Sequence, residues 1–256
     1  MPPDREDIAR QVHGHLQSLR GAGVEWLPAA PPLSMPPETA PTAASAALFT
    51  EEASAPRAPA APPEERRQAL QMLAQEVASC CRCAELASTR TQTVFGRGGI
   101  GVDLCFVGEA PGADEDAKGQ PFVGAAGQLL SKIIAACGLR EDEVYICNIL
   151  KCRPPGNRTP LPNEAANCRT FLERQIDLVA PRFICALGSC AAQNLLNTTA
   201  SLGKLRGRFH DFRGIPVLVT YHPAYLLPHR SPEKKRDVWE DMKVLLTRMG
   251  RPIPRK

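Results

Sequence analysis

The stretch DLCFVGEAPGADEDAKGQPFVGAAGQLL (103–130) decides the fold that the sequence predicts. It begins with a short apolar run, DLCFVGE (103–109), which indicates a buried strand. A loop rich in glycine, proline and acidic residues follows, and apolar spacing then predicts a helix from about 125 to 137. A strand, a loop and a helix in this order form the unit from which helix-covered parallel sheets are built.

The same alternation continues toward the C-terminus. Strands are predicted at EVYICNI (143–149), RFICALG (182–188), FHDFRG and IPVLVT (215–220), and helices at about 163–179, 189–197 and 233–248. We therefore expect an α/β protein with three α/β/α layers around a central, mostly parallel four-stranded sheet. Ligands bind such sheets beyond the carboxyl ends of the strands, where the loops 108–124, 148–160 and 221–228 are expected to meet.

Residues 1–63 differ from the rest of the chain. They hold 12 of the 25 prolines and have 4 basic and 7 acidic residues, whereas the remaining 27 basic and 20 acidic residues give that part a charge of +7. Such a Pro/Ala-rich stretch buries too little apolar surface to fold, so we expect a disordered extension. A short amphipathic helix at 4–20 either docks on the core or a protein partner, or is marginal. The domain itself is predicted over 64–250, starting with a helix, EERRQALQMLAQEVASC.

Composition excludes several classes of protein. No apolar run approaches the roughly 20 residues that cross a bilayer, and the N-terminus MPPDREDIARQ lacks the apolar region of a signal peptide. We expect a monomeric cytoplasmic protein that contacts no membrane. The basic body suits a polyanion, although solubility explains the charge equally well.

Ten cysteines in a cytosolic protein indicate metal binding or burial rather than disulfides. Cys80 and Cys83 form a C-x2-C pair, and fifteen residues separate Cys152 from Cys168. Thiolates at such spacings can hold zinc or an iron–sulfur cluster. The second pair is spaced too widely for a typical zinc ribbon and suits a cluster that anchors a long Pro-rich loop. We interpret Cys81 as a bystander and expect the remaining five to be small buried hydrophobes: Cys105, Cys137, Cys147, Cys185 and Cys190.

The first strand-end loop carries carboxylates and one aromatic ring. Gly108 permits close approach of the backbone to a ligand. Glu109 and Glu115 can position water or stabilise a developing cation, or can serve only as helix caps on a solvated loop. Phe122 can stack on a flat ring or fill the core.

Two further strand ends carry polar side chains. Asn148 offers both a donor and an acceptor, which match the hydrogen-bonding edge of uracil, although an Asn there is often a turn residue. His222 can donate to a developing oxyanion or be structural. The candidate DNA contacts are a base-stack wedge and a phosphate grip, formed by Tyr225, Leu226, Arg206 and Arg208. Their alternatives are ordinary packing and solvation.

Taken in order, GEAPG, EDAKGQPFVGAAGQLL, YICNILKCRPPGNRTPLPNEAANC, ICALGSCAA and HPAYLL resemble family 4 uracil-DNA glycosylases, the iron–sulfur branch of that superfamily. The resemblance covers about residues 66–248. It implies an enzyme that flips uracil out of single- or double-stranded DNA and hydrolyses its N-glycosidic bond, which initiates base excision repair. It also implies a [4Fe–4S] cluster held by Cys80, Cys83, Cys152 and Cys168.

The same resemblance implies roles for individual residues. Phe122 stacks on uracil, Asn148 reads its edge, and His222 supports the departing uracil anion. Ala110 stands where another branch has a water-activating Asp, so Glu115 is our first candidate for orienting water and Glu109 the alternative.

A strand-cleaving or covalent mechanism is not expected. No lysine is evidently placed as a Schiff-base nucleophile, and the loop KCRPPGNRTPLP lacks the Lys-Arg-Arg-Ile-His insertion of covalent-trapping relatives. Two other classes remain as alternatives: a non-catalytic iron–sulfur DNA-binding or polymerase-associated factor, and an electron-transfer protein. The presence of Glu115, Asn148 and His222 argues against the first, and the acidic loop and HPAYLL have no evident purpose in the second.

Overall fold

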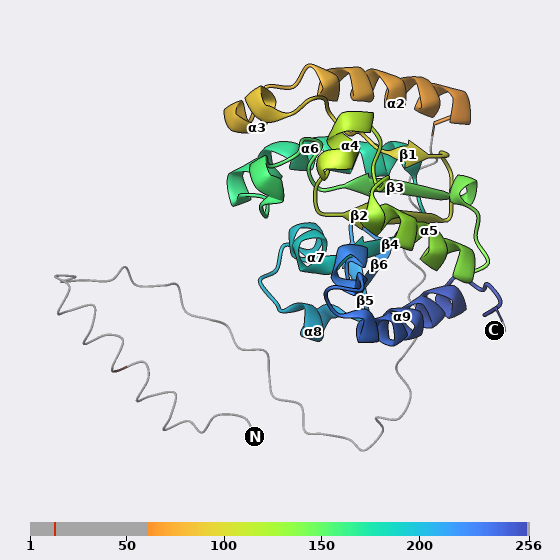
Figure 1. Cartoon of the computed structure of the whole chain (residues 1–256). Helices are drawn as coiled ribbons and strands as arrows, with labels where there is room; N and C mark the ends of the chain where they lie inside the picture. Colours follow the sequence, from red (N-terminus) through yellow and green to blue (C-terminus); the bar gives the residue numbers. More distant parts are fainter. Residues whose placement is uncertain (1–12, 14–60, 255–256) are drawn as a thin grey trace. The chain divides into compact units, whose positions relative to one another are not determined.

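The computed structural model describes His13 and residues 61–254 (Figure 1). His13 is helical and exposed, and the rest of the predicted 4–20 helix lies outside the described residues, as does most of the 1–63 extension. In the part that is described, no helix combines the length and the apolar character needed to cross a membrane.

Helices and strands alternate as the apolar periodicity predicts. The helices are α2 (Pro63–Ala78), α3 (Ala84–Thr89), α4 (Ala113–Lys118), α5 (Ala125–Ala136), α6 (Pro162–Val179), α7 (Gly188–Leu196), α8 (Leu202–Leu205) and α9 (Lys235–Arg248). The strands are β1 (Arg97–Gly98), β2 (Leu104–Gly108), β3 (Val144–Asn148), β4 (Phe183–Leu187), β5 (Phe209–Phe212) and β6 (Ile215–Thr220).

The sheet has six strands in the order β1-β3-β2-β4-β6-β5, so the prediction of four was too low. The central strands β3, β2, β4 and β6 are parallel, and the two edge strands run antiparallel to their neighbours. β2, β3 and β4 are buried along their whole length, which is why they read as continuous apolar runs. β1 has only two residues, too few for any periodicity to reveal.

Helices cover both faces of this sheet, which confirms the three-layer α/β/α architecture. α6 and α7 lie on one face, where the core contains Val107, Cys147, Leu172, Ile176, Ala191 and Leu195. α5 and α9 lie on the other, where the core contains Phe106, Ile146, Leu130, Ile134, Met242 and Leu245. α2 packs outside α6 (Figure 1).

One loop of the prediction is a helix. Residues 113–118, ADEDAK, form α4, although their apolar content is too low to indicate one. Gly112, the residue before the helix, donates its N–H to the Glu115 carboxylate, and Gly119, the residue after the helix, adopts a left-handed conformation. α4 places Glu115 beside the segment that leads into α5.

A third, smaller core lies between α2, α3 and α6. It contains Leu73, Leu86 and Phe171 with Cys152 and Cys168, and Cys80 and Cys83 pack against it. All five cysteines that we expected to be small buried hydrophobes are buried, and Cys81 is exposed.

Candidate active site

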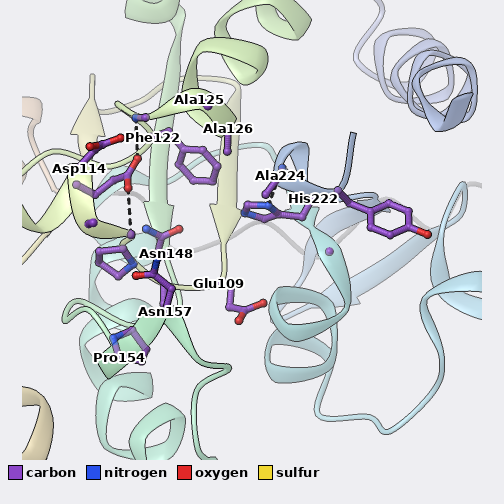
Figure 2. A pocket seen from close by; sticks show the side chains of 18 of the residues that line it. Glu109, Asp114, Phe122, Ala125, Ala126, Asn148, Pro154, Asn157, His222 and Ala224 are labelled. Carbon is purple, nitrogen blue, oxygen red and sulfur yellow. Dashed lines mark hydrogen bonds between the residues drawn. The ribbon is translucent and has the colours of Figure 1, made fainter. Parts of the chain in front are cut away.

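A cavity of about 740 Å³ opens at the carboxyl edge of the parallel strands. Glu109, Phe122, Asn148 and His222 line it, so the structure brings together the polar and aromatic candidates of three separate loops (Figure 2). This is the edge at which ligands bind in open α/β sheets.

Asn148 is the last residue of β3 and pairs with Gly108 of β2. Its side chain is only 2% exposed, and its Oδ1 atom is buried without a hydrogen-bond partner. A Cβ atom on Gly108 would lie 2.4 Å from that oxygen and 2.6 Å from Cζ of Phe122. The absence of a side chain at position 108 therefore lets the amide and the ring lie against the strand end. A buried polar atom without a partner is costly, and a ligand at this place would satisfy it.

Phe122 is 6% exposed and adopts φ 55°, a left-handed conformation that costs a non-glycine residue about 1–3 kcal/mol. Its ring centroid lies 5.6 Å from that of His222, with 32° between the planes. A Cβ atom on Gly127, in the first turn of α5, would come within 1.9 Å of the Phe122 carbonyl oxygen. This position therefore requires a glycine. The strained backbone holds the ring at the wall of the cavity.

Glu115 accepts hydrogen bonds from three backbone amides. Gly112 N–H donates to Oε2 at 3.1 Å, and the N–H groups of Val123 and Gly124 donate to Oε1, each at 2.9 Å. The carboxylate thus clamps the two residues that follow Phe122. With both oxygens engaged, Glu115 is better placed to hold this loop than to orient water.

Glu109 directly follows β2 and lines this cavity, and it also lines a second cavity beside α6 and α7. Burial raises the pKa of this carboxyl above its ordinary value of 4.5. Figure 2 shows Glu109 across the cavity from Phe122. A partly buried carboxylate that lines a cavity is suited to bind and orient a water molecule.

His222 follows β6 and begins a short 3-10 turn, Pro223–Leu226. Its Nδ1 atom accepts a hydrogen bond from the Ala224 N–H at 3.1 Å, so the proton of the neutral ring resides on Nε2. Burial lowers the pKa of His222 to about 4. The ring is therefore a neutral donor at physiological pH.

The four predicted DNA contacts differ in accessibility. Arg208 and Tyr225 are exposed, and the Tyr225 ring stacks on Tyr221 with centroids 5.5 Å apart. Leu226 is completely buried in the core, so it cannot be the wedge that we predicted. Arg206 is also unsuited to grip phosphate, because its guanidinium group pairs with buried Asp241 at 3.0 Å.

Several further residues that the sequence does not single out also line the cavity, among them Asn157, Arg158, Ser189 and Arg230. Asn157 adopts φ 56° and accepts a hydrogen bond from Nε of Arg153 at 2.8 Å. The Gly-Asn pair in PPGNR is a turn signal that could have drawn attention to it.

The four candidate ligands lie together in the small core between α2, α3 and α6, where Cys152 and Cys168 are buried and Cys80 and Cys83 pack against them. Burial raises the pKa of Cys152 more than the adjacent Arg90 guanidinium lowers it, and Cys80 and Cys83 raise it further. Burial likewise raises the pKa of Cys168 to about 11, with a contribution from Cys152 and Cys83. Across the described residues, no set of three or more His, Cys, Asp or Glu side chains is arranged to hold a metal ion. Four clustered thiols are a donor set that suits an iron–sulfur cluster and also suits zinc.

Comparison with known proteins is consistent with this geometry. Residues 95–243 match the Uracil DNA glycosylase superfamily. The chain is 43% identical to the type-4 uracil-DNA glycosylase of Thermotoga maritima over 179 residues, 69% of this chain and 93% of that protein. Its identity to the type-4 uracil-DNA glycosylase of Archaeoglobus fulgidus is 38%, over 73% of this chain and 96% of that protein. For the type-4 enzyme of Sulfurisphaera tokodaii the identity is 40%, over 68% and 82%.

Proposed function

Because this chain belongs to the type-4 branch of the uracil-DNA glycosylase superfamily, we propose a role for each residue of the cavity in removing uracil from DNA. The chain is a uracil-DNA glycosylase, a hydrolase of N-glycosyl bonds that acts in base excision repair. Its substrate is DNA that contains uracil, and we propose that both single- and double-stranded forms are accepted.

The flipped base is held between Phe122 and Asn148. Extruding a nucleotide costs a few kcal/mol of pairing and stacking energy, which contacts in the pocket must offset. The Phe122 ring stacks on the uracil ring. The Asn148 amide, whose Oδ1 has no protein partner, accepts from uracil N3–H and donates to O4. This buried, unpartnered oxygen beside an aromatic ring is the observation that carries the proposal.

Bond cleavage is proposed to develop opposite charges on sugar and base. The C1′–N1 bond breaks with oxocarbenium character on the sugar, and its electron pair passes to uracil. The Nε2–H of His222 stabilises the resulting negative charge on O2. Because the ring is neutral, it donates a hydrogen bond without first losing or gaining a proton.

We propose that Glu109 orients the attacking water. Glu109 lines the cavity, whereas the carboxylate of Glu115 is engaged by three backbone amides. Water adds to C1′, and Glu109 accepts its proton. No lysine is among the described residues that line the cavity, and Lys151 donates instead to the Asn148 carbonyl oxygen, which supports a monofunctional enzyme.

We further propose that Cys80, Cys83, Cys152 and Cys168 hold a [4Fe–4S] cluster. When bound, the cluster supplies a covalent crosslink between the α2–α3 junction, the loop after β3, and α6. Cys152 lies four residues after Asn148, so this crosslink anchors the loop that follows the uracil-reading strand. For contacts with DNA we propose Tyr225 and Arg208, both of which are exposed.

The direct test is release of free uracil from single- and double-stranded oligonucleotides, with thymine-containing oligonucleotides as substrate control. Asn148→Ala is expected to lower the single-turnover rate at least about 100-fold, because uracil loses its polar partner. Gln128→Ala, which removes an exposed amide on α5, is the matched control and should leave the rate unchanged. A near-normal rate in Asn148→Ala would remove this residue from the reading role.

A further inference from the structure

Arg90 contacts one of the four clustered cysteines directly. It is the residue after α3, and its Nη1 atom donates to Sγ of Cys152 at 2.9 Å. Its Nη2 atom donates to the Cys80 carbonyl oxygen at 2.8 Å. One guanidinium group therefore bridges the two cysteine pairs, which are far apart in the sequence.

The charge of Arg90 is complemented by sulfur rather than by a carboxylate. Within residues 61–254, the ion pairs of the structure give Arg90 no acidic partner, although seventeen join other basic and acidic residues. The Cys152 sulfur that it contacts stands for a cluster-bound thiolate. Such a thiolate carries negative charge, so the contact would be a charge-assisted hydrogen bond when the cluster is present.

The two residues after Arg90 connect this contact to α4. The backbone N–H of Thr91 donates to both carboxylate oxygens of Asp116, each at 3.0 Å, and the N–H of Gln92 lies 3.5 Å from one of them. Asp116 is 3% exposed. In addition, the side-chain amide of Gln92 donates through Nε2 to the Ala117 carbonyl oxygen at 2.9 Å. Residues 90–92 are thus fastened to the cysteine core at one end and to α4 at the other.

α4 in turn fixes the loop that holds the aromatic ring of the uracil pocket. Glu115, the neighbour of Asp116, clamps the N–H groups of Val123 and Gly124. These follow Phe122, whose φ of 55° requires such support. Hydrogen bonds at Cys152, Asp116 and Glu115, joined by short covalent segments of the chain, therefore lead from the cysteine core to the residues that follow the base-stacking ring.

We propose that Arg90 is the positioning residue that couples the iron–sulfur cluster to the uracil pocket through Asp116 and α4. This inference rests on the proposed cluster and on the proposed role of Phe122. A hydrogen bond from a cation to a cluster sulfur favours the reduced, more negative cluster, so it raises the reduction potential. The same contact holds residues 90–92 where Asp116 can bind them.

The test compares the purified, cluster-loaded wild type with Arg90→Met, which keeps similar volume without charge or donors. The reduction potential, measured by mediated potentiometry at the visible absorption band, should become more negative. The single-turnover rate of uracil release should fall about tenfold, as is typical when an outer-shell partner of a metal site is lost. Arg90→Lys should recover part of both, which would show that the effect does not come from misfolding.

Two further variants separate the parts of the link. Asp116→Asn should lower uracil release to a similar extent while leaving the potential unchanged, and Arg90→Met/Asp116→Asn should release uracil no more slowly than either single variant. Arg82→Met is the matched control, because Arg82 lies over the Phe171 ring and contacts Thr170 rather than sulfur. It should change the potential less than Arg90→Met and leave uracil release unchanged.

The outcomes distinguish this inference from the proposed function. A colourless wild type would overturn the proposed cluster, and a wild type that releases no uracil would overturn the proposed function itself. A brown, active wild type whose potential and rate are the same in Arg90→Met would overturn only the coupling role of Arg90. A changed potential with an unchanged rate would show that the contact ends at the cluster and is not transmitted to the pocket.

Discussion

The backbone N–H of Ala224 donates to Nδ1 of His222 at 3.1 Å, and this single contact determines which ring nitrogen carries the proton. The imidazole must present Nε2–H to the cavity, and burial keeps it neutral by lowering its pKa to about 4. The His222→Gln variant lacks the imidazole donor, so its single-turnover rate of uracil release should be lower by about 100-fold or more, as when an enzyme loses one oxyanion donor. Ala224→Gly keeps the backbone N–H and should retain most activity.

The pH dependence of stability follows from the same shift. In the unfolded chain His222 binds a proton near its ordinary pKa of 6.5, whereas in the folded protein it does so only near 4. Its contribution to stability is therefore fully present above pH 6.5 and is lost as the pH falls toward 4. Urea unfolding of wild type and His222→Gln at several pH values should give a stability difference that shrinks in acid. A stability difference that does not depend on pH would contradict a neutral His222 in the folded protein.

Glu109 should control the acidic limb of the rate profile. A carboxylate that orients water and accepts its proton must be ionised, and burial raises the pKa of Glu109 above 4.5. The single-turnover rate should therefore decrease as the pH falls through that raised pKa. Glu109→Gln should lower the rate about 100-fold or more and abolish this limb. Retention of the limb in Glu109→Gln would assign the water to another group.

Glu115 should behave differently from Glu109 in a matched pair of variants. Glu115→Gln retains an amide oxygen that can accept from Val123 and Gly124, so the loss of activity should be smaller than in Glu109→Gln. Glu115→Ala leaves backbone amides unpaired beside the strained Phe122, and the free energy of unfolding should fall by about 1–3 kcal/mol. Kinetics and urea unfolding measure the two effects. Equal loss in Glu115→Gln and Glu109→Gln would argue for a direct role of Glu115.

The sequence predicted what depends on local patterns. β2 and β3 are buried on both faces, so continuous apolar runs in the sequence predict them. Their carboxyl ends lie at one edge of the sheet, which brings Asn148 and Glu109 to the same cavity. The sequence-based predictions are wrong where contacts between residues far apart in the chain determine whether a side chain is accessible. Arg206 reads as a surface cation, but its partner Asp241 lies 35 residues away in the sequence. Leu226 belongs to an apolar run, AYLL, in which some side chains are exposed and others are buried. The turn after His222 determines which side chains are buried, and the sequence does not reveal it.

Polar helices, and carboxylates that bind distant backbone amides, are equally hard to predict from the sequence. α4 has six residues, of which three are acidic, and it depends on caps at both ends rather than on an apolar face. The role of Glu115 was interpreted from its place near a strand end, whereas the structure engages it with amides eight and nine residues later. Interactions of this kind have no periodic signature in the sequence, because the partners are set by the three-dimensional fold.

The cluster makes the clearest prediction about the purified protein. If Cys80, Cys83, Cys152 and Cys168 hold a thiolate-ligated [4Fe–4S] group, the protein should be brown and absorb near ~400 nm through sulfur-to-iron charge transfer. The Cys152→Ser variant lacks one of the four cluster ligands, so it should lose most of its iron. Its thermal stability should also be lower, because the loop after Asn148 is no longer anchored to the cluster. Cys81→Ser is the matched control, since Cys81 is adjacent in sequence but exposed, and it should keep both colour and iron. Metal analysis that finds stoichiometric zinc in a colourless wild-type protein would refute the cluster. The pocket formed by Phe122, Asn148 and His222 would still support the glycosylase, because none of the four cysteines is among the residues that line it.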